Sequence, residues 1–197
     1  MLSNQVSKVT GGSGPSTGLK IEWEDFNFPP LFRLVHFSLA ELPPDYKRVV
    51  RMIFLSFVFL IANQTLNLIN QIAQVVEGEE GIRIFYAFLN IFIYLPVGMF
   101  TFYRGYKGLC ADKSLLLIYK ILQLALAVNY ILFAILDSGA STGFVRVKDL
   151  LDMGWDFSGG LGVVESILYL LNALLAVFTV WQVHTFIPER EKPQTAI

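Results

Sequence analysis

The sequence is poor in the side chains that most often carry chemistry. Its 197 residues include one cysteine and two histidines. Cys110 alone permits no internal disulfide. No second thiol and no acidic cluster accompanies His36 or His184, which argues against metal ligation and nucleophilic catalysis. The glycines of DFSGGLG follow no strand, so they form no phosphate-binding loop. We therefore expect no enzyme activity, no metal and no cofactor.

The first residues lack a signal peptide. The stretch MLSNQVSKVTGGSGPSTG is polar and rich in glycine and serine, without an apolar core or a cleavage pattern. This composition predicts disorder over residues 1–25, within a cytosolic N-terminal tail of residues 1–47. The first membrane helix would then act as an uncleaved signal, which agrees with a cytosolic N-terminus.

Long apolar runs are what the sequence has in abundance. Hydrophobic residues make up 54% of the chain, against about 45–50% in soluble domains. A helix needs about 20 mostly apolar residues to cross a hydrocarbon core of about 30 Å, whereas barrel strands would be shorter and would alternate in polarity. The sequence therefore predicts an all-α integral membrane protein, with a four-helix transmembrane domain over residues 48–184. The helices are expected at about Met52–Ile72, Ile84–Phe102, Leu115–Leu136 and Leu161–Val183.

The charged residues between these runs alternate in sign. Basic residues dominate before the first run and between the second and third, whereas acidic residues dominate the other two connections. Because Lys and Arg are enriched on the cytosolic side, the N-terminus, the central connector and the C-terminal tail (185–197) are predicted to be cytosolic. The basic set is Arg33, Lys47, Arg48, Arg51, Arg104, Lys107 and Lys113. The acidic set is Glu77, Glu79, Glu80, Asp137, Asp149, Asp152 and Asp156, with Arg83, Arg146 and Lys148 among them.

Polar residues inside the runs are candidates for function, because burying them in lipid is costly. Asn63, Asn67, Asn70 and Gln74 are spaced by four, three and four residues, which places them on one face of the first helix. We expect Asn63, Asn67 and Asn70 to pack helices together through interhelical hydrogen bonds. A solute pathway is the alternative, and it is disfavoured because no acidic residue joins the stripe.

Lys120 and Glu165 are the charged side chains that lie well inside the runs. The third helix enters from the cytosol and the fourth from the opposite face, so the two groups should be about 15 Å apart along the membrane normal. We expect no direct pair, and we expect Lys120 to extend toward the cytosolic interface. The polar residues of the other helices, Gln123, Asn129 and Asn172, are expected to add little to a pathway.

The central connector, within MFTFYRGYKGLCADKS, combines aromatic and basic residues. Aromatic rings favour the headgroup level, and basic side chains gain about 1 kcal/mol each near an anionic leaflet. Simple anchoring of the helices explains the same pattern and stays open. Cys110 lies at this boundary, where palmitoylation is chemically plausible, although an inert reduced thiol is the simpler interpretation.

Four stretches, taken in order, make the chain recognisable. NFPPL precedes the membrane, and LPPDYKRVVRM leads into the first helix. The second helix ends in Leu95–Pro96, and FYRGYKGLCADKS follows. A Gly154-Trp155 pair precedes the fourth helix, which exits through VHTF. With its four spans, the chain resembles the secretory carrier-associated membrane proteins over residues 27–186. These form a tetraspan family of post-Golgi and recycling vesicles.

The chain also departs from the family pattern. The connector lacks the family's proline and is one residue shorter, with Gly105 between Arg104 and Tyr106. Thr101 and Phe102 replace a Cys-Trp pair. No Asn-Pro-Phe tripeptide is present, so binding to EH-domain adaptors is not implied. The chain therefore resembles a divergent or short-tailed member.

The resemblance implies a role in exocytosis, endocytosis and protein transport, at the trans-Golgi network, recycling endosomes, secretory vesicles and the plasma membrane. It implies that Arg104, Tyr106, Lys107 and Lys113 touch phosphoinositide headgroups. Partners would be membrane lipids and other trafficking membrane proteins or a second copy of the chain, with no nucleic acid. A small four-helix transporter or channel is the alternative, which would need polar residues of several helices to converge at one depth, with helix breaks.

Overall fold

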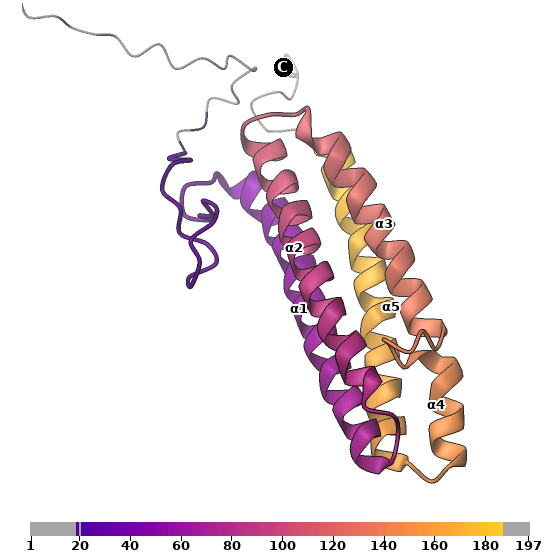
Figure 1. Cartoon of the computed structure of the whole chain (residues 1–197). Coiled ribbons are helices and arrows are strands. Elements are labelled where there is room, and N and C mark those ends of the chain that lie inside the picture. Colours follow the sequence, from indigo (N-terminus) through magenta and orange to yellow (C-terminus); the bar gives the residue numbers. More distant parts are fainter. Residues whose placement is uncertain (1–18, 20, 187–197) are drawn as a thin grey trace, which may run out of the picture.

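The computed structural model describes residue 19 and residues 21–186. Within that range the chain forms α1 (Pro44–Glu77), α2 (Ile82–Cys110), α3 (Leu115–Ile135), α4 (Gly143–Asp152) and α5 (Asp156–Thr185), with no strand (Figure 1). All but α4 are long and apolar enough to cross a membrane. The prediction of an all-α protein with four spans is confirmed. Disorder was expected over residues 1–25, of which residues 1–18 and 20 lie outside the described residues, as does the C-terminal tail beyond residue 186. The rest of that segment is described, and Trp23 in it packs against Tyr106.

Three of the spanning helices extend beyond their apolar runs. α1 begins at Pro44, whose missing N–H costs nothing in the first turn of a helix. It ends before Gly78, which has a φ of +123°. α2 continues to Cys110, and α5 begins at Asp156. Hydropathy identifies the part of a helix that lies in lipid. It does not identify the polar turns by which a helix continues into water.

Pro96 lies inside α2 and not near its end, which corrects the expectation from the sequence. A proline removes one helical hydrogen bond, here the bond to the carbonyl of Phe92. Membrane helices tolerate this loss because neighbouring groups and small backbone adjustments compensate the freed carbonyl. α2 therefore crosses the membrane unbroken and carries the connector's first residues with it.

The four long helices form an antiparallel bundle. α1 contacts α2 and α5, and α3 contacts the same two helices. The start of α1 meets the end of α5, where the rings of Tyr46 and Phe186 are 4.9 Å apart. We call this the terminal end of the bundle, and the opposite end the far end (Figure 1). Both ends of the described chain thus lie on one side, as an even number of spans requires.

The connection between the third and fourth spans holds a helix that the sequence did not reveal. α4 is a short amphipathic helix that buries Val147 and Leu150 and packs against α5 near the far end (Figure 1). Gly162 of α5 permits this close approach, because a Cβ there would lie 2.8 Å from methyl groups of Thr142 and Val147. The packing holds Thr142, just before α4, against the inside of the bundle.

The outward faces of the spans are apolar, as contact with lipid requires. Exposed side chains there include Phe92, Leu117, Ile121, Leu174 and Val177. The interior changes in character along its length. Near the terminal end it is filled by large apolar groups, including Ile53, Phe57, Phe102 and Tyr106. Toward the far end it is filled by amide and carboxyl groups, including Asn63, Asn67, Asn70, Gln71 and Glu165.

Candidate functional site

The predicted lipid-binding residues lie at the terminal end, and three of them are helical. α2 includes Arg104, Tyr106 and Lys107 in its last two turns and ends at Cys110. The connector proper is therefore reduced to residues 111–114, which contain Lys113. The angular positions of these side chains on α2 decide which of them can meet a headgroup together.

Arg104 and Lys107 share one cleft of about 350 Å³, which we call the α2 cleft. The guanidinium of Arg104 lies 4.6 Å from the ring centroid of Phe100. The Nζ atom of Lys107 lies 5.6 Å from the ring of Trp23 and 5.9 Å from that of Tyr103. Residues three apart face the same side of a helix, so two cations and an aromatic wall meet here. The lining residues are Phe100, Tyr103, Arg104, Lys107, Asp112 and Leu115.

Asp112 is the acidic member of the α2 cleft. Its Oδ1 atom accepts a 3.0 Å hydrogen bond from the backbone N–H of Ser114. The pKa of Asp112 lies below its usual value, chiefly because the side chain and then the backbone N–H of Ser114 donate hydrogen bonds to it. The nearby charges of Lys107 and Arg104 lower the pKa further. The carboxylate therefore stays ionised at neutral pH and offsets one of the two cations.

Tyr106 does not lie on this surface. Its side chain is fully buried, with its ring 5.4 Å from those of both Trp23 and Phe37. The segment before α1 folds back over the end of α2 and covers it. This position does not allow a direct contact between Tyr106 and a headgroup, so Tyr106 is not among the contacts that we propose.

Lys113 faces a separate cleft of about 170 Å³ with Lys120 and His184. The Nζ atom of Lys120 lies 3.4 Å from Nδ1 of His184, so Lys120 extends toward the terminal end. The structure thus brings Arg104 and Lys107 together and separates Lys113 from them.

The amide stripe of α1 lies at the centre of a buried polar cluster. The Nδ2 groups of Asn67 and Asn70 donate to Oε1 and Oε2 of Glu165 at 2.9 and 2.8 Å. Glu165 is fully buried, and the backbone N–H of Thr142 also donates to it at 3.3 Å. An acidic residue does join the stripe, which corrects the sequence analysis. Asn67 and Asn70 bridge helices as expected. Asn63 is equally buried, but its amide has no hydrogen-bond partner among the described residues.

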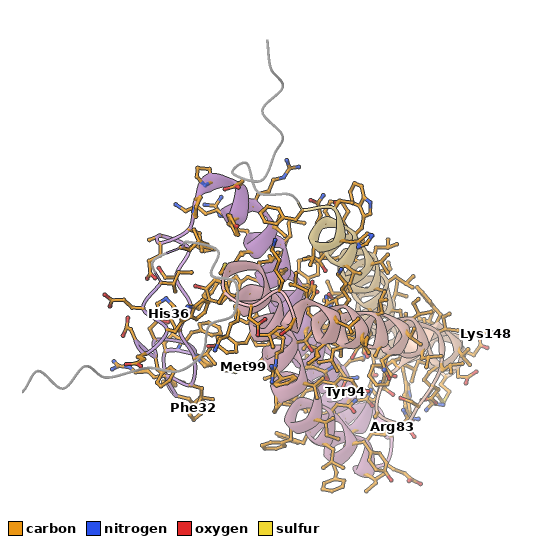
Figure 2. The ribbon with its side chains drawn as sticks, turned by 90° about the horizontal axis from the view of Figure 1, so that it is seen from above. Phe32, His36, Arg83, Tyr94, Met99 and Lys148 are labelled. Carbon is orange, nitrogen blue, oxygen red and sulfur yellow. The ribbon has the colours of Figure 1, made fainter. Side chains whose placement is uncertain are left out.

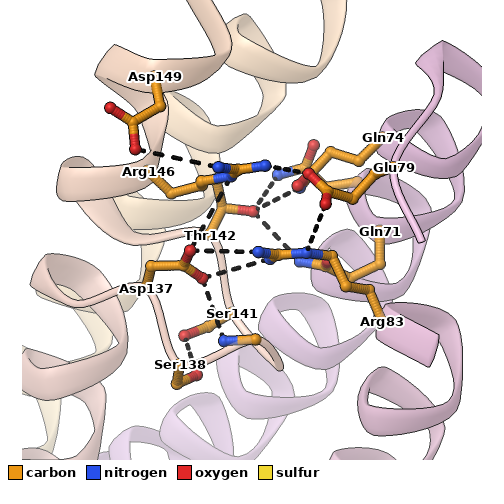
Figure 3. Close-up of polar contacts among 12 residues, drawn as sticks. Gln71, Gln74, Glu79, Arg83, Asp137, Ser138, Ser141, Thr142, Arg146 and Asp149 are labelled. Atoms are coloured by element: carbon orange, nitrogen blue, oxygen red, sulfur yellow. Dashed lines mark hydrogen bonds and ion pairs between the residues drawn. The ribbon is translucent and has the colours of Figure 1, made fainter. Parts of the chain in front are cut away.

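Thr142 connects the stripe to the connection before α4 (Figure 3). Its hydroxyl oxygen accepts hydrogen bonds from Asn70, Gln71 and Gln74 at 2.7, 3.2 and 2.9 Å. Asn67 completes the attachment by donating to the carbonyl of Ala140 at 2.8 Å. Four amide side chains of one helix therefore hold a distant loop inside the bundle.

A second buried network lies nearer the terminal end. Gln123 of α3 donates to the hydroxyls of Ser56 and Thr179 at 2.8 and 3.4 Å. Ser56 in turn donates to Oδ1 of Asn172 at 3.4 Å. Gln123 and Asn172 therefore link α1, α3 and α5, a packing role that the sequence analysis did not assign to them. Asn129 lies apart and accepts a hydrogen bond from Tyr94.

An ion cluster joins the two acidic connections at the far end (Figure 3). Arg83 binds Asp137 through two parallel hydrogen bonds of 3.2 Å and lies 3.7 Å from Glu79. Arg146 of α4 pairs with the same Glu79 and lies 3.9 Å from Asp137. Asp149 also lies 3.9 Å from Arg146, so two cations face three carboxylates, and Glu165 is left to the neutral donors described above.

Comparison with known proteins identifies the family. A model of the SCAMP family matches residues 25–190, which is most of the chain. The chain belongs to the SCAMP family. Membership implies a role in membrane trafficking, and it confirms the resemblance read from the four motifs. Neither the curated proteins nor the solved structures gave a match.

The burial of Cys110 bears on its chemistry in this SCAMP protein. Cys110 is the last residue of α2, is 2% exposed and belongs to the apolar core. A buried thiol presents no surface to a modifying enzyme, so the inert interpretation fits the structure better than palmitoylation.

Several residues that shape the sites of this SCAMP protein carried no signal in the sequence. Trp23 and Phe37 cover Tyr106, and Thr142 anchors the amide stripe, yet all three belong to segments between or before the spans. Their roles follow from how those segments fold back on the bundle, which hydropathy does not report. Glu165 did carry a signal, as a charge within a span, but its partners were not predicted.

Proposed function

We propose that this SCAMP protein acts in the trafficking of post-Golgi and recycling vesicles, in exocytosis, endocytosis and protein transport, by binding phosphoinositide headgroups in the α2 cleft. Family membership supports the trafficking role, and the paired cations of the cleft support the lipid contact. Arg104 and Lys107 are the principal contacts in this proposal. Lys113 contributes from the neighbouring cleft.

The terminal end is proposed to face the cytosol. It carries Lys47, Arg48, Arg51, Arg104, Lys107 and Lys113, whereas the far end carries the acidic connections. Positive residues near the ends of spans favour the cytosolic side during insertion. The same side carries anionic lipid, so the orientation places the α2 cleft where its ligands are.

The cleft suits an anionic headgroup for two reasons. Each basic side chain near an anionic leaflet contributes about 1 kcal/mol, and Asp112 offsets one such contribution. The rings of Phe100 and Tyr103 hold the two cations beside the membrane surface, where aromatic groups prefer to lie. The arrangement therefore concentrates charge at headgroup depth without burying it.

The test uses the full-length protein in detergent, titrated with a short-chain phosphoinositide. We expect the Arg104→Gln/Lys107→Gln variant to lose about 30-fold in affinity, because two contributions of about 1 kcal/mol each are removed. The control is Arg48→Gln/Arg51→Gln, which removes the same charge at the same end but outside the cleft. Equal losses in the two variants would leave general surface charge as the explanation and would count against a defined cleft.

The proposed compartments and partners are those of the family: the trans-Golgi network, recycling endosomes, secretory vesicles and plasma membrane, with other trafficking membrane proteins or a second copy as partners. A tagged copy expressed in cells should colocalise with markers of these membranes. Retention in the endoplasmic reticulum would contradict the proposal.

A small transporter remains the second candidate, because one observation favours it. Polar side chains of several elements converge at one depth, around Glu165. Against it, α2 is unbroken at Pro96, and the core near the terminal end is filled by Phe57, Phe102 and other large apolar groups. Solute uptake by reconstituted protein, lost in Asn67→Leu, would favour the transporter over the trafficking role.

A further inference from the structure

The segment before α1 forms a hairpin on the outside of the bundle, over residues 26–37. A bridge between Phe28 and Val35 holds its two arms together. The hairpin lies beside the first turns of α1 (Figure 1). Seen along the bundle, Phe32 and His36 of the hairpin lie on the same side as Met99, opposite Lys148 (Figure 2).

Aromatic contacts place the hairpin at the depth of the hydrocarbon. The ring of Phe28 lies 5.8 Å from that of Phe54 and 6.4 Å from that of Phe57. Phe37 stacks on Phe54 at 4.8 Å. Phe54 and Phe57 lie about 4.5 and about 9 Å beyond Arg51 along α1, at about 1.5 Å per residue. Both are within the apolar run that begins after Arg51.

The hairpin satisfies nearly all of its own backbone donors, which lowers the cost of placing a segment that is not a helix in lipid. The N–H groups of residues 27, 28, 34 and 35 donate across the hairpin, and those of 32 and 33 donate to the carbonyl of Pro29. Pro29 and Pro30 have no N–H to satisfy. Leu31, at the tip, is the one amide of residues 27–35 without a backbone partner among the described residues.

The tip is apolar and exposed. Leu31, Phe32 and Leu34 are 90%, 72% and 60% exposed. Exposure of three large apolar side chains within four residues is unfavourable in water and favourable among acyl chains. Arg33, beside them, makes no ion pair with the described residues and is long enough to reach the headgroup level.

An apolar groove of about 550 Å³ lies between the hairpin and the spans. Its lining offers no polar surface, and it comes from the hairpin, α1 and α2. On the side of the spans its lining includes Ile61, Leu95, Pro96 and Met99. Because Ile61, Leu95 and Pro96 belong to the spans, the groove opens within the hydrocarbon layer.

We propose that the hairpin inserts into the leaflet at the terminal end, and that the groove binds one acyl chain of an anionic phospholipid from that leaflet. The depth of the groove selects hydrocarbon as its occupant, and the exposed Arg33, which lies between the lining residues Phe32 and Leu34 in the sequence, favours an anionic headgroup. The inserted tip displaces lipid in one leaflet only. This site is distinct from the α2 cleft, which faces the headgroup layer, and it does not depend on the function proposed for that cleft.

The insertion is tested with nitroxide labels on full-length protein in nanodiscs containing anionic lipid. A label on Leu31→Cys should be accessible to oxygen, which partitions into lipid, and protected from a water-soluble nickel chelate. A label on Ser114→Cys, an exposed connector position, should show the reverse. A Leu31 label as accessible to the chelate as the Ser114 label would overturn the insertion.

The groove is tested with an anionic phospholipid that carries a photoreactive group in its acyl chain. Crosslinks should concentrate on the hairpin, Leu95 and Met99, and should fall at least fivefold in Met99→Trp, which fills the groove. Leu117→Trp, a matched change on the exposed face of α3, should leave them unchanged. Ile61→Trp provides a second filling variant should Met99→Trp fail to fold.

Three outcomes would overturn the acyl-chain site. Crosslinks spread evenly over all exposed span residues would indicate surrounding lipid only. A photoreactive residue placed at Leu95 tests the other two occupants. A crosslink from it to residues 1–18 would make the chain's own N-terminal segment the occupant. A crosslink from it to a second copy, with a dimer on analysis of mass, would make the groove an interface.

Discussion

The side-chain amide of Asn67 donates one hydrogen to Oε1 of Glu165 at 2.9 Å and the other to the carbonyl of Ala140 at 2.8 Å. One side chain of α1 thus holds both α5 and the connection that precedes α4. Because no Lys or Arg pairs with Glu165 in the described part of the chain, neutral donors alone stabilise this carboxyl. The far half of the bundle is therefore organised by hydrogen bonds, whereas the terminal half is organised by apolar packing.

This relationship predicts unequal effects within the amide stripe. Asn67→Ala should destabilise the protein by about 1 kcal/mol more than Asn63→Ala, because it removes two interhelical hydrogen bonds of about 0.6 kcal/mol each. Both side chains are fully buried, so the two variants remove the same atoms from similar surroundings. Equilibrium unfolding in mixed detergent and dodecyl sulfate measures the difference. Equal losses would show that the bonds to Glu165 and Ala140 add nothing to packing.

Glu165 should tolerate an amide better than an apolar group. Glu165→Gln keeps an acceptor for Asn67 or Asn70 and should cost about 1 kcal/mol or less. Glu165→Leu leaves several buried N–H groups unpaired, at about 1–3 kcal/mol each, and should cost more than about 2 kcal/mol. The same unfolding assay compares them. A leucine variant as stable as the glutamine variant would mean that the amides find other partners.

The four spans were predictable because lipid imposes one rule on every crossing segment: internal hydrogen bonding over about 20 apolar residues. The polar convergence was not, because it depends on a connection with no apolar run. Thr142 meets α1 only when α4 packs on α5 beside Gly162. A stripe of amides indicates that a helix has a polar partner, but it does not indicate which loop supplies that partner.

The ion cluster at the far end should stabilise the closed connections. Asp137→Asn removes the carboxylate that Arg83 and Arg146 share, and it should cost about 1 kcal/mol at low salt. The side chains of both arginines are less than one-fifth exposed, at 12% and 16%, so the loss should persist in part at high salt. Glu80→Gln is the control, because Glu80 is exposed at the same end. A control variant that unfolds as early as Asp137→Asn would point to net charge as the cause.

The proposed orientation can be tested at two exposed residues that lie at opposite ends of the bundle. Ser114→Cys should react with a membrane-impermeant maleimide added to the cytosolic side, whereas Glu80→Cys should react only after the membrane is permeabilised. The native Cys110 is buried and should give a low background, which the unsubstituted protein measures. Cytosolic labelling of Glu80→Cys would invert or abolish the proposed four-span orientation.

The α2 cleft shows where reasoning from sequence succeeds and where it stops. Charge beside aromatic residues drew attention to the connector, and the family resemblance implied that Arg104 and Lys107 contact headgroups. The spacing of these two residues brings them together once the helix reaches Cys110. The same resemblance implied a headgroup contact for Tyr106, which is buried because Trp23 and Phe37 from a distant segment cover it. Composition identifies a surface of the membrane interface, whereas tertiary packing decides which side chains stay on it.

The acidic residue of the cleft supplies the last prediction. Asp112→Asn should strengthen the binding of a short-chain phosphoinositide by up to about fivefold, because one charge that opposes the headgroup is removed. The asparagine keeps an oxygen for the Ser114 N–H, so the connector should keep its shape.

The pH dependence of this effect follows from the pKa of Asp112, which is held below its usual value. The side chain therefore loses its charge only at a lower pH than an ordinary aspartate does. A parallel series should use phosphatidylglycerol as the ligand, because its headgroup does not titrate between pH 7 and pH 5. The ratio of the affinity of the Asp112→Asn variant to that of the unsubstituted protein should then stay constant over this range. A ratio that falls toward one near pH 5 would show that Asp112 is protonated there and that its hydrogen bonds do not hold the charge.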